Sequence, residues 1–138
     1  MADALFGKTW HMNSGASIFS SDFKPATETR LYEERDNGYK LTVSGSNNGN
    51  YYQWWYEAYH DGKSYPVHGR SDVSAITIYR ISDKITVGFF EKEVSPGVMM
   101  PGGPYARKLS ADGTSLEVQA AGRNSDGTAF FDVINYQL

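Results

Sequence analysis

The chain contains no cysteine, no long apolar run and no cluster of basic residues. Without cysteine it can form no disulfide, no thiolate nucleophile and no cysteine-ligated zinc site. No segment approaches the roughly 20 apolar residues that a membrane-spanning helix needs. The 13 lysines and arginines are scattered and outnumbered by 16 acidic residues, which gives a net charge of -3 and a pI near 5.5. We therefore expect no nucleic-acid partner and no membrane partner.

Signals for targeting and for common cofactors are also missing. Residues 1–6 show no basic region followed by an apolar stretch, so the sequence predicts no signal peptide and a cytoplasmic location. There is no phosphate-binding glycine loop, no Gly-x-Ser-x-Gly elbow and no His-Glu-x-x-His motif. We expect no cofactor and no metal. A length of 138 residues predicts one domain spanning residues 1–138.

What the chain does contain is a regular succession of short strands and tight turns. No helical period persists for three turns, and Asn-Gly or Asp-Gly pairs recur at residues 37, 48, 61, 112 and 126. Sequential hairpins of this kind predict an all-β fold, an antiparallel up-and-down barrel of eight to ten strands. Residues 14–23 predict a loop with one short helical turn near the N-terminus. A barrel of this size has room inside for one small ligand.

The most aromatic stretch, residues 50–62, predicts one long strand. Because side chains alternate between the two faces of a strand, its residues divide into two sets. The set expected to face the interior is Tyr52, Trp54, Tyr56, Ala58 and His60. The set expected to face outward is Tyr51, Gln53, Trp55, Glu57 and Tyr59. The first set predicts the wall of a pocket, and the alternative is an ordinary packed interior.

Several local motifs resemble those of the lipocalin-like, or calycin-type, small barrels, and in particular short cytoplasmic bacterial members. These motifs are Gly7-Lys8-Thr9-Trp10-His11-Met12-Asn13, the segment from Tyr56 to Val67, Arg80-Ile81-Ser82-Asp83, the segment from Leu109 to Leu116, and Asp132-Val133-Ile134-Asn135-Tyr136. The resemblance implies a barrel that binds small apolar or amphipathic ligands, with Trp10 at the cavity floor or as a plug of the core. A minority of such relatives are enzymes.

The main functional hypothesis is binding of a small apolar or aromatic molecule in the barrel. The ligand-binding residues that we predict are Trp10, Tyr52, Trp54, Tyr56, His60, Tyr79, Phe90, Met99, Met100 and Tyr136. The two methionines lie in residues 95–104, which hold three of the five prolines and predict an irregular loop over the cavity mouth.

Two other functions fit the same residues. The first is a cofactor-free isomerase, cyclase, lyase or hydratase, with His60 as acid or base and Tyr56 or Tyr79 orienting a carbonyl group. The second is a homodimer formed through the outward aromatic residues of the strand at 50–62. A metal or a haem held by histidines at positions 11, 60 and 68 is a weaker alternative.

Charged residues interrupt several of the expected strands, namely Arg70, Arg80, Glu91 and Arg107. We expect each of them on the outer face of the barrel, where water solvates the charge. A buried pair of such groups would instead mark a site for an anion or a carbonyl group.

Overall fold

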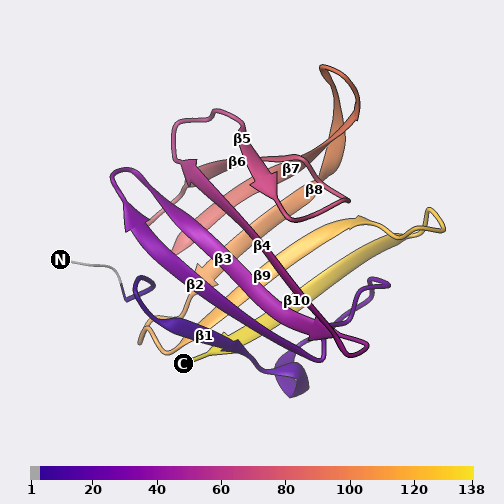
Figure 1. Ribbon diagram of the computed structural model, residues 1–138. Helices are drawn as coiled ribbons and strands as arrows, with labels where there is room; N and C mark the ends of the chain where they lie inside the picture. The colour runs from indigo at the N-terminus through magenta and orange to yellow at the C-terminus, as the bar shows by residue number, and fades with distance from the viewer. Residues whose placement is uncertain (1–3) are drawn as a thin grey trace.

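The computed structural model describes residues 4–138, and the first residues of the segment considered for a signal peptide, 1–3, lie outside this range. The strands, in chain order, are β1 (Thr9–Met12), β2 (Thr27–Arg35), β3 (Gly38–Asn47), β4 (Asn50–Tyr59), β5 (Tyr65–His68), β6 (Ala75–Arg80), β7 (Ile85–Ser95), β8 (Val98–Leu109), β9 (Ser115–Arg123) and β10 (Ala129–Gln137). One short 3-10 helix, η1 (Ser14–Ala16), follows β1. Figure 1 shows the strands wrapping around one interior.

The strands form a closed antiparallel barrel in which each strand pairs with its neighbours in sequence, and β1 pairs with β10 to complete the ring. The predicted all-β barrel and the helical turn near the N-terminus are therefore confirmed. The tight turns follow the predicted chemistry. Asn37 and Asn48 adopt positive φ angles of 57° and 52°, a conformation that asparagine and glycine tolerate in two-residue hairpins.

The aromatic strand β4 separates its side chains between the two faces of the barrel wall as expected. Trp54, Tyr56 and Ala58 are buried, whereas Trp55 is 36% exposed and Tyr51 is 72% exposed. Alternation along the strand thus places two adjacent tryptophans on opposite sides of the sheet. The wall is one layer thick, so the inner set of side chains forms the core of the molecule.

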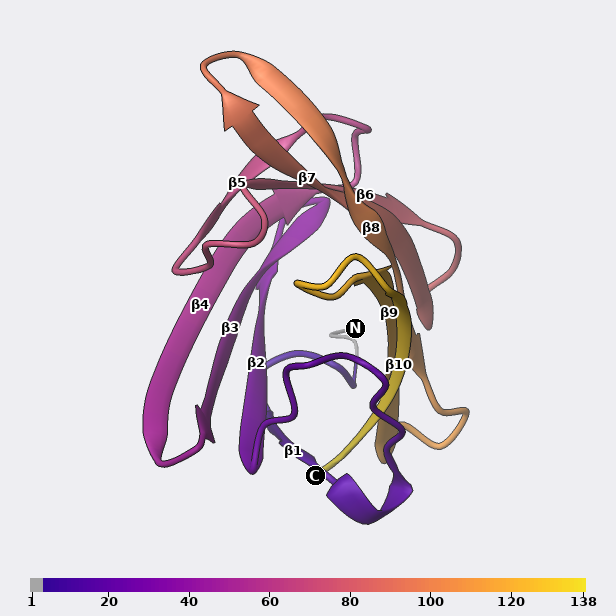
Figure 2. The same ribbon diagram turned by 90° about the vertical axis from the view of Figure 1, so that its right-hand side faces the viewer.

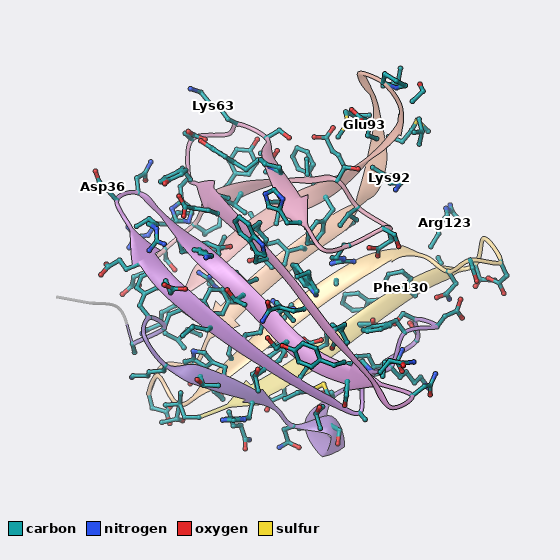
Figure 3. The ribbon with its side chains drawn as sticks, in the orientation of Figure 1. Asp36, Lys63, Lys92, Glu93, Arg123 and Phe130 are labelled. Atoms are coloured by element: carbon teal, nitrogen blue, oxygen red, sulfur yellow. The ribbon has the colours of Figure 1, made fainter. Side chains whose placement is uncertain are left out.

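One end of the barrel is filled by a packed core. Trp10 is fully buried there, and its indole nitrogen donates a hydrogen bond to the carbonyl oxygen of Leu5 at 3.0 Å. The turns between β2 and β3, β4 and β5, β6 and β7, and β8 and β9 lie at this end, which we call the closed end. Asp36 and Lys63, labelled in Figure 3, belong to two of these turns.

The structure corrects the prediction of an irregular loop at residues 95–104. These residues instead form the tip of a β7–β8 hairpin that projects beyond the barrel (Figure 2). Pro101 and Pro104 are tolerated because β9 pairs with β8 only from Tyr105 onward, so the missing N–H groups interrupt no ladder on that side. A bulge between Phe90 and Glu91 adjusts the β7–β8 register beside them.

The other end is open, and a single segment crosses it. We call residues 17–26, between η1 and β2, the strap; Figure 2 shows it passing across this end of the barrel. The β9–β10 turn lies at the same end, next to Arg123 (Figure 3). Among residues 4–138 there is no helix long and apolar enough to cross a membrane.

Candidate functional site

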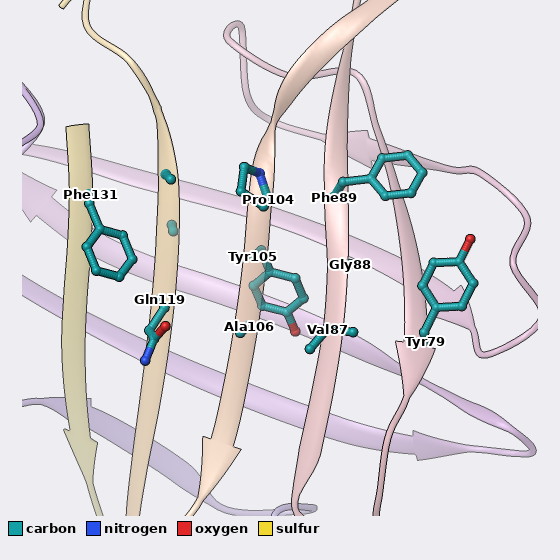
Figure 4. Close-up of a pocket in the computed structure, with 11 residues that line it drawn as sticks. Tyr79, Val87, Gly88, Phe89, Pro104, Tyr105, Ala106, Gln119 and Phe131 are labelled. Carbon is teal, nitrogen blue, oxygen red and sulfur yellow. The ribbon is translucent and has the colours of Figure 1, made fainter. Parts of the chain in front are cut away.

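Two hollows, one on each side of the barrel wall, are candidates for a site. A groove of about 400 Å³ lies on the outer face of β6 to β10, with Tyr79 and Phe89 at one edge and Phe131 at the other (Figure 4). No charged side chain lines this groove. Its surface is mainly apolar, and the polar side chains that line it include Tyr79 and Gln119.

The second hollow is a cavity of about 510 Å³ inside the barrel at the open end. Its walls combine aromatic rings with charged groups, a combination typical of small-molecule sites. The side chains around it come from the strap, from strands on both sides of the barrel and from the β5–β6 and β9–β10 connections. They include Phe19, Phe23, Glu28, Arg30, Leu41, Tyr52, Trp54, Tyr56, Arg70, Phe90, Tyr105, Val118, Phe130, Asp132 and Ile134. We take this cavity as the candidate functional site.

Arg30 brings a buried positive charge to the cavity wall. It lies on β2 with only 6% of its surface exposed, and its Nε is 3.5 Å from an oxygen of Glu28. Its guanidinium carbon lies 5.0 Å from the centre of the Tyr136 ring and 5.8 Å from that of Trp54. The Nε has no hydrogen-bond partner within residues 4–138, and Nη1 donates a long hydrogen bond of 3.4 Å to the Tyr32 hydroxyl. The hydrogen-bonding capacity of the Arg30 guanidinium is therefore not fully used by the described residues.

Glu28 is held by three neighbours. The Tyr52 hydroxyl donates to one carboxylate oxygen at 2.6 Å, the Tyr136 hydroxyl donates to the other, and Arg30 supplies the positive charge. Burial raises the pKa of Tyr52, and the nearby Glu28 carboxylate raises it further, so this hydroxyl stays a donor at neutral pH. With its oxygens already engaged, Glu28 neutralises Arg30 and positions it.

A second arginine stands at the cavity mouth. Arg70, in the β5–β6 connection, forms a bidentate ion pair with Asp72 at 2.8 and 2.6 Å. Its guanidinium carbon lies 4.7 Å from the Trp54 ring and 5.2 Å from the Phe90 ring. Trp54 thus contacts Arg30 from within the cavity and Arg70 at the rim, and these contacts fix its orientation.

The strap is fastened to β10 by Asp132. This buried carboxylate accepts hydrogen bonds from the backbone N–H groups of Ser20 and Ser21, at 2.9 and 3.0 Å, and from the Ser21 hydroxyl at 2.6 Å. At the far side of the mouth, Phe23 meets Tyr52 edge to face with ring centres 5.2 Å apart. The strap therefore covers part of the opening. Asp132 holds it on one side of the mouth, and the contact between Phe23 and Tyr52 holds it on the other.

The structure divides the predicted ligand-binding residues among several places. Tyr52, Trp54, Tyr56 and Phe90 line the cavity. Trp10 and Tyr136 are fully buried but do not line it. Tyr79 lies on the outer face at the groove, and Met99 and Met100 are exposed on the β7–β8 hairpin away from the cavity wall.

His60, the predicted acid or base, does not line the cavity. It follows β4 at the closed end, where its ring lies 6.0 Å from that of Tyr39. Burial and the nearby Arg107 charge lower its pKa, which favours the neutral imidazole. His68 stacks on the outward Trp55 at 4.2 Å, and His11 is exposed on β1. Within residues 4–138 no group of three metal-ligating side chains occurs.

The expectation that Arg107 faces outward is wrong, because it lies inside the barrel with 5% of its surface exposed. Glu91 does lie on the outer side of its strand, opposite Ala75. Arg80 is exposed at the end of β6, but on the face that it shares with the buried Ile76 and Ile78. Sequence reasoning missed Glu28 and Arg30 altogether. In β2 the apolar Leu31 suggests that the other face of the strand is the inner one. The pairing of Arg30 with the buried Trp10 and Val43 shows the true orientation.

Comparisons with family models, with curated proteins and with solved structures found no match to this chain.

Proposed function

We propose that this protein binds a small, largely apolar and aromatic molecule inside the barrel. The observation that carries the proposal is the interior cavity of about 510 Å³, walled by aromatic rings and holding the buried Arg30. A volume of this order suits one small organic molecule. Planar rings such as Trp54 and Phe90 favour a planar partner, since offset and edge-to-face ring contacts add to the gain from apolar burial.

The polar groups of the wall favour a ligand that is not purely hydrocarbon. Arg30 lines the cavity, and its buried Nε has no hydrogen-bond partner within residues 4–138, which is costly for a buried donor. A ligand oxygen that accepts from Arg30 removes this cost. Amphipathic aromatic molecules with at least one acceptor oxygen therefore fit better than plain hydrocarbons.

The barrel type belongs to the same proposal. The closed antiparallel barrel with one interior site is compatible with the lipocalin-like, calycin-type architecture that the motifs resemble. Support for this finer assignment comes from the sequence motifs and the barrel topology together. A cytoplasmic location and a homodimer through the outward aromatic residues of β4 stay predictions, and His60 receives no role in the cavity.

The test compares two adjacent tryptophans. Native mass spectrometry of the purified protein would first detect any co-purified small molecule, and calorimetric titration with indole, 1-naphthol and 4-nitroanisole would then measure binding. Trp54→Leu removes an aromatic wall, so we expect its affinity to fall by about tenfold. Trp55→Leu is the matched control, because Trp55 points outward from the same strand. Equal affinities in the two variants would place the ligand elsewhere, and no binding of any probe would remove the proposal.

A further inference from the structure

Three tyrosines form a hydrogen-bonded cluster at the floor of the cavity. Tyr39, Tyr56 and Tyr105 come from β3, β4 and β8, and we call them the tyrosine triad. The Tyr39 hydroxyl lies 2.8 Å from the Tyr56 hydroxyl and 3.0 Å from the Tyr105 hydroxyl. Tyr56 and Tyr105 also line the cavity, whereas Tyr39 lies behind them. The triad therefore connects the cavity with the closed core.

Counting protons shows that the triad has a donor to spare. Three hydroxyls carry three protons, and the two hydrogen bonds between them use two. Within residues 4–138 the three hydroxyls bond only to one another. If Tyr39 donates to one neighbour and accepts from the other, the remaining proton sits on Tyr56 or on Tyr105. Both of these residues belong to the cavity wall, so in this arrangement the spare proton belongs to a residue that lines the cavity.

Arg107 lies behind the triad and supplies a positive charge. Its guanidinium carbon is 5.0 Å from the centre of the Tyr39 ring and 4.9 Å from that of Tyr32. Its Nη2 donates to the Thr86 hydroxyl at 2.8 Å, whereas Nε and Nη1 have no partner within residues 4–138.

No carboxylate neutralises this charge. None of the ion pairs formed within the described part of the chain includes Arg107, in contrast to Arg30 with its Glu28. A buried charge without a counter-ion is costly, and it is stabilised by any negative charge nearby. The tyrosines do not supply that charge at neutral pH, because burial raises the pKa values of Tyr39 and Tyr56 well above the usual range.

We infer that the tyrosine triad, with Arg107 behind it, binds a single negatively charged oxygen of the ligand. The ligand class is then an acidic phenol or enol, bound as its anion with the ring against the aromatic wall. One spare hydroxyl proton at one point suits one oxygen better than the two oxygens of a carboxylate. This inference deepens the proposed function and rests on it, because it concerns the inner end of the same cavity.

The test uses a phenol whose ionisation is visible. 4-Nitrophenol ionises near neutral pH with a change in absorbance, and 4-nitroanisole has the same ring but cannot ionise. Quenching of tryptophan fluorescence reports that either probe is bound. If the site prefers the anion by about tenfold, the bound 4-nitrophenol has a pKa about one unit below that of the free probe. The pKa of 4-nitrophenol bound to the unaltered protein therefore tests whether the site prefers the anion before any variant is made.

Variants then locate the site. Tyr56→Phe and Tyr105→Phe each remove a hydroxyl from the triad, so we expect both to reduce the shift in the probe's pKa. Tyr79→Phe is the control, because Tyr79 lies on the outer face of the barrel wall and contacts neither the triad nor the cavity. Its shift should equal that of the unaltered protein.

The outcomes separate the inference from the proposed function. If both probes quench the fluorescence saturably but the pKa of 4-nitrophenol is not lowered, the cavity binds aromatic molecules and the inference is overturned. A shift that persists unchanged in Tyr56→Phe and Tyr105→Phe also overturns it and assigns the oxygen to Arg30. If neither probe binds, the inference fails together with the proposed function.

Discussion

The attachment of the strap by Asp132 leads to a quantitative prediction. Asp132→Ala removes the acceptor for three hydrogen bonds that hold Ser20 and Ser21 on β10. Hydrogen bonds to a charged group contribute about 1.5–3 kcal/mol each, so three would sum to about 4.5 kcal/mol or more if the strap stayed in place. Ser20 is exposed, however, so the strap can detach and its N–H groups can then bond to water.

We therefore expect a local effect larger than the global one. The free energy of opening the strap should fall by about 2 kcal/mol, which accelerates hydrogen exchange at the Ser20 and Ser21 amides about 30-fold. The free energy of global unfolding, measured with urea, should fall by less, because the barrel closes through its own β1–β10 pairing. A strap that opens more often should also speed ligand association.

Two comparison variants sharpen this experiment. Asp132→Asn keeps an oxygen that can accept from both backbone N–H groups, so its effect on exchange should be smaller than that of alanine. Asp61→Ala removes an exposed carboxylate whose bonds go to Lys63 and Tyr65 at the closed end, and it should leave the strap unchanged. Unchanged exchange at Ser20 and Ser21 in Asp132→Ala would refute the reasoning and assign the attachment to the other bonds of the strap, such as the Ile18–Val133 bridge and those between Ser20 and Phe131.

Two further predictions concern stability. Hydrogen bonds from the Ser110 and Thr114 side chains lower the pKa of Asp112 to about 2, below its usual 3.8. The ionised carboxylate therefore stabilises the folded protein at pH values above 3.8, and this stabilisation is lost as the pH falls towards 2. Asp112→Asn should therefore lower the thermal midpoint at pH 7, and the difference should vanish near pH 2; a difference independent of pH would contradict this assignment. Gly103 has a φ of +113°, and an added Cβ would overlap the carbonyl oxygen of Ala121, so Gly103→Ala should cost at least about 2 kcal/mol in urea unfolding. Gly97→Ala, also at positive φ but in open space, should cost less, and equal losses would show that conformation rather than overlap is responsible.

The sequence of β4 predicts part of the site without knowledge of the fold. Its alternation predicted that Trp54 and Tyr56 face inward and that Trp55 faces outward, and the structure agrees. Alternation is a property of the backbone alone and needs no information about neighbouring strands. His60 was assigned to the same inner set, but the strand ends at Tyr59, so the parity of the strand no longer places it in the cavity.

The β7–β8 hairpin and the charged interior show the opposite case. Pro101 and Pro104 argue against a strand, because proline has no N–H to donate to a neighbouring strand. They are compatible with β8 only because β9 does not pair with this part of it, and that pairing is set by the tertiary structure. Arg107 could be placed inside only once Tyr32 and Tyr39 were known to surround it.

The sequence by itself thus determined the local features of this protein: the strands, the Asn-Gly and Asp-Gly turns that reverse them, and the inner aromatic face of β4. These follow from backbone conformation and from the two-residue period of a strand. Only the tertiary structure decided which charges are buried, which hydroxyls meet and where the cavity opens. Those properties depend on register between strands distant in sequence, such as the approach of Tyr39 to Tyr105, and no local pattern encodes them.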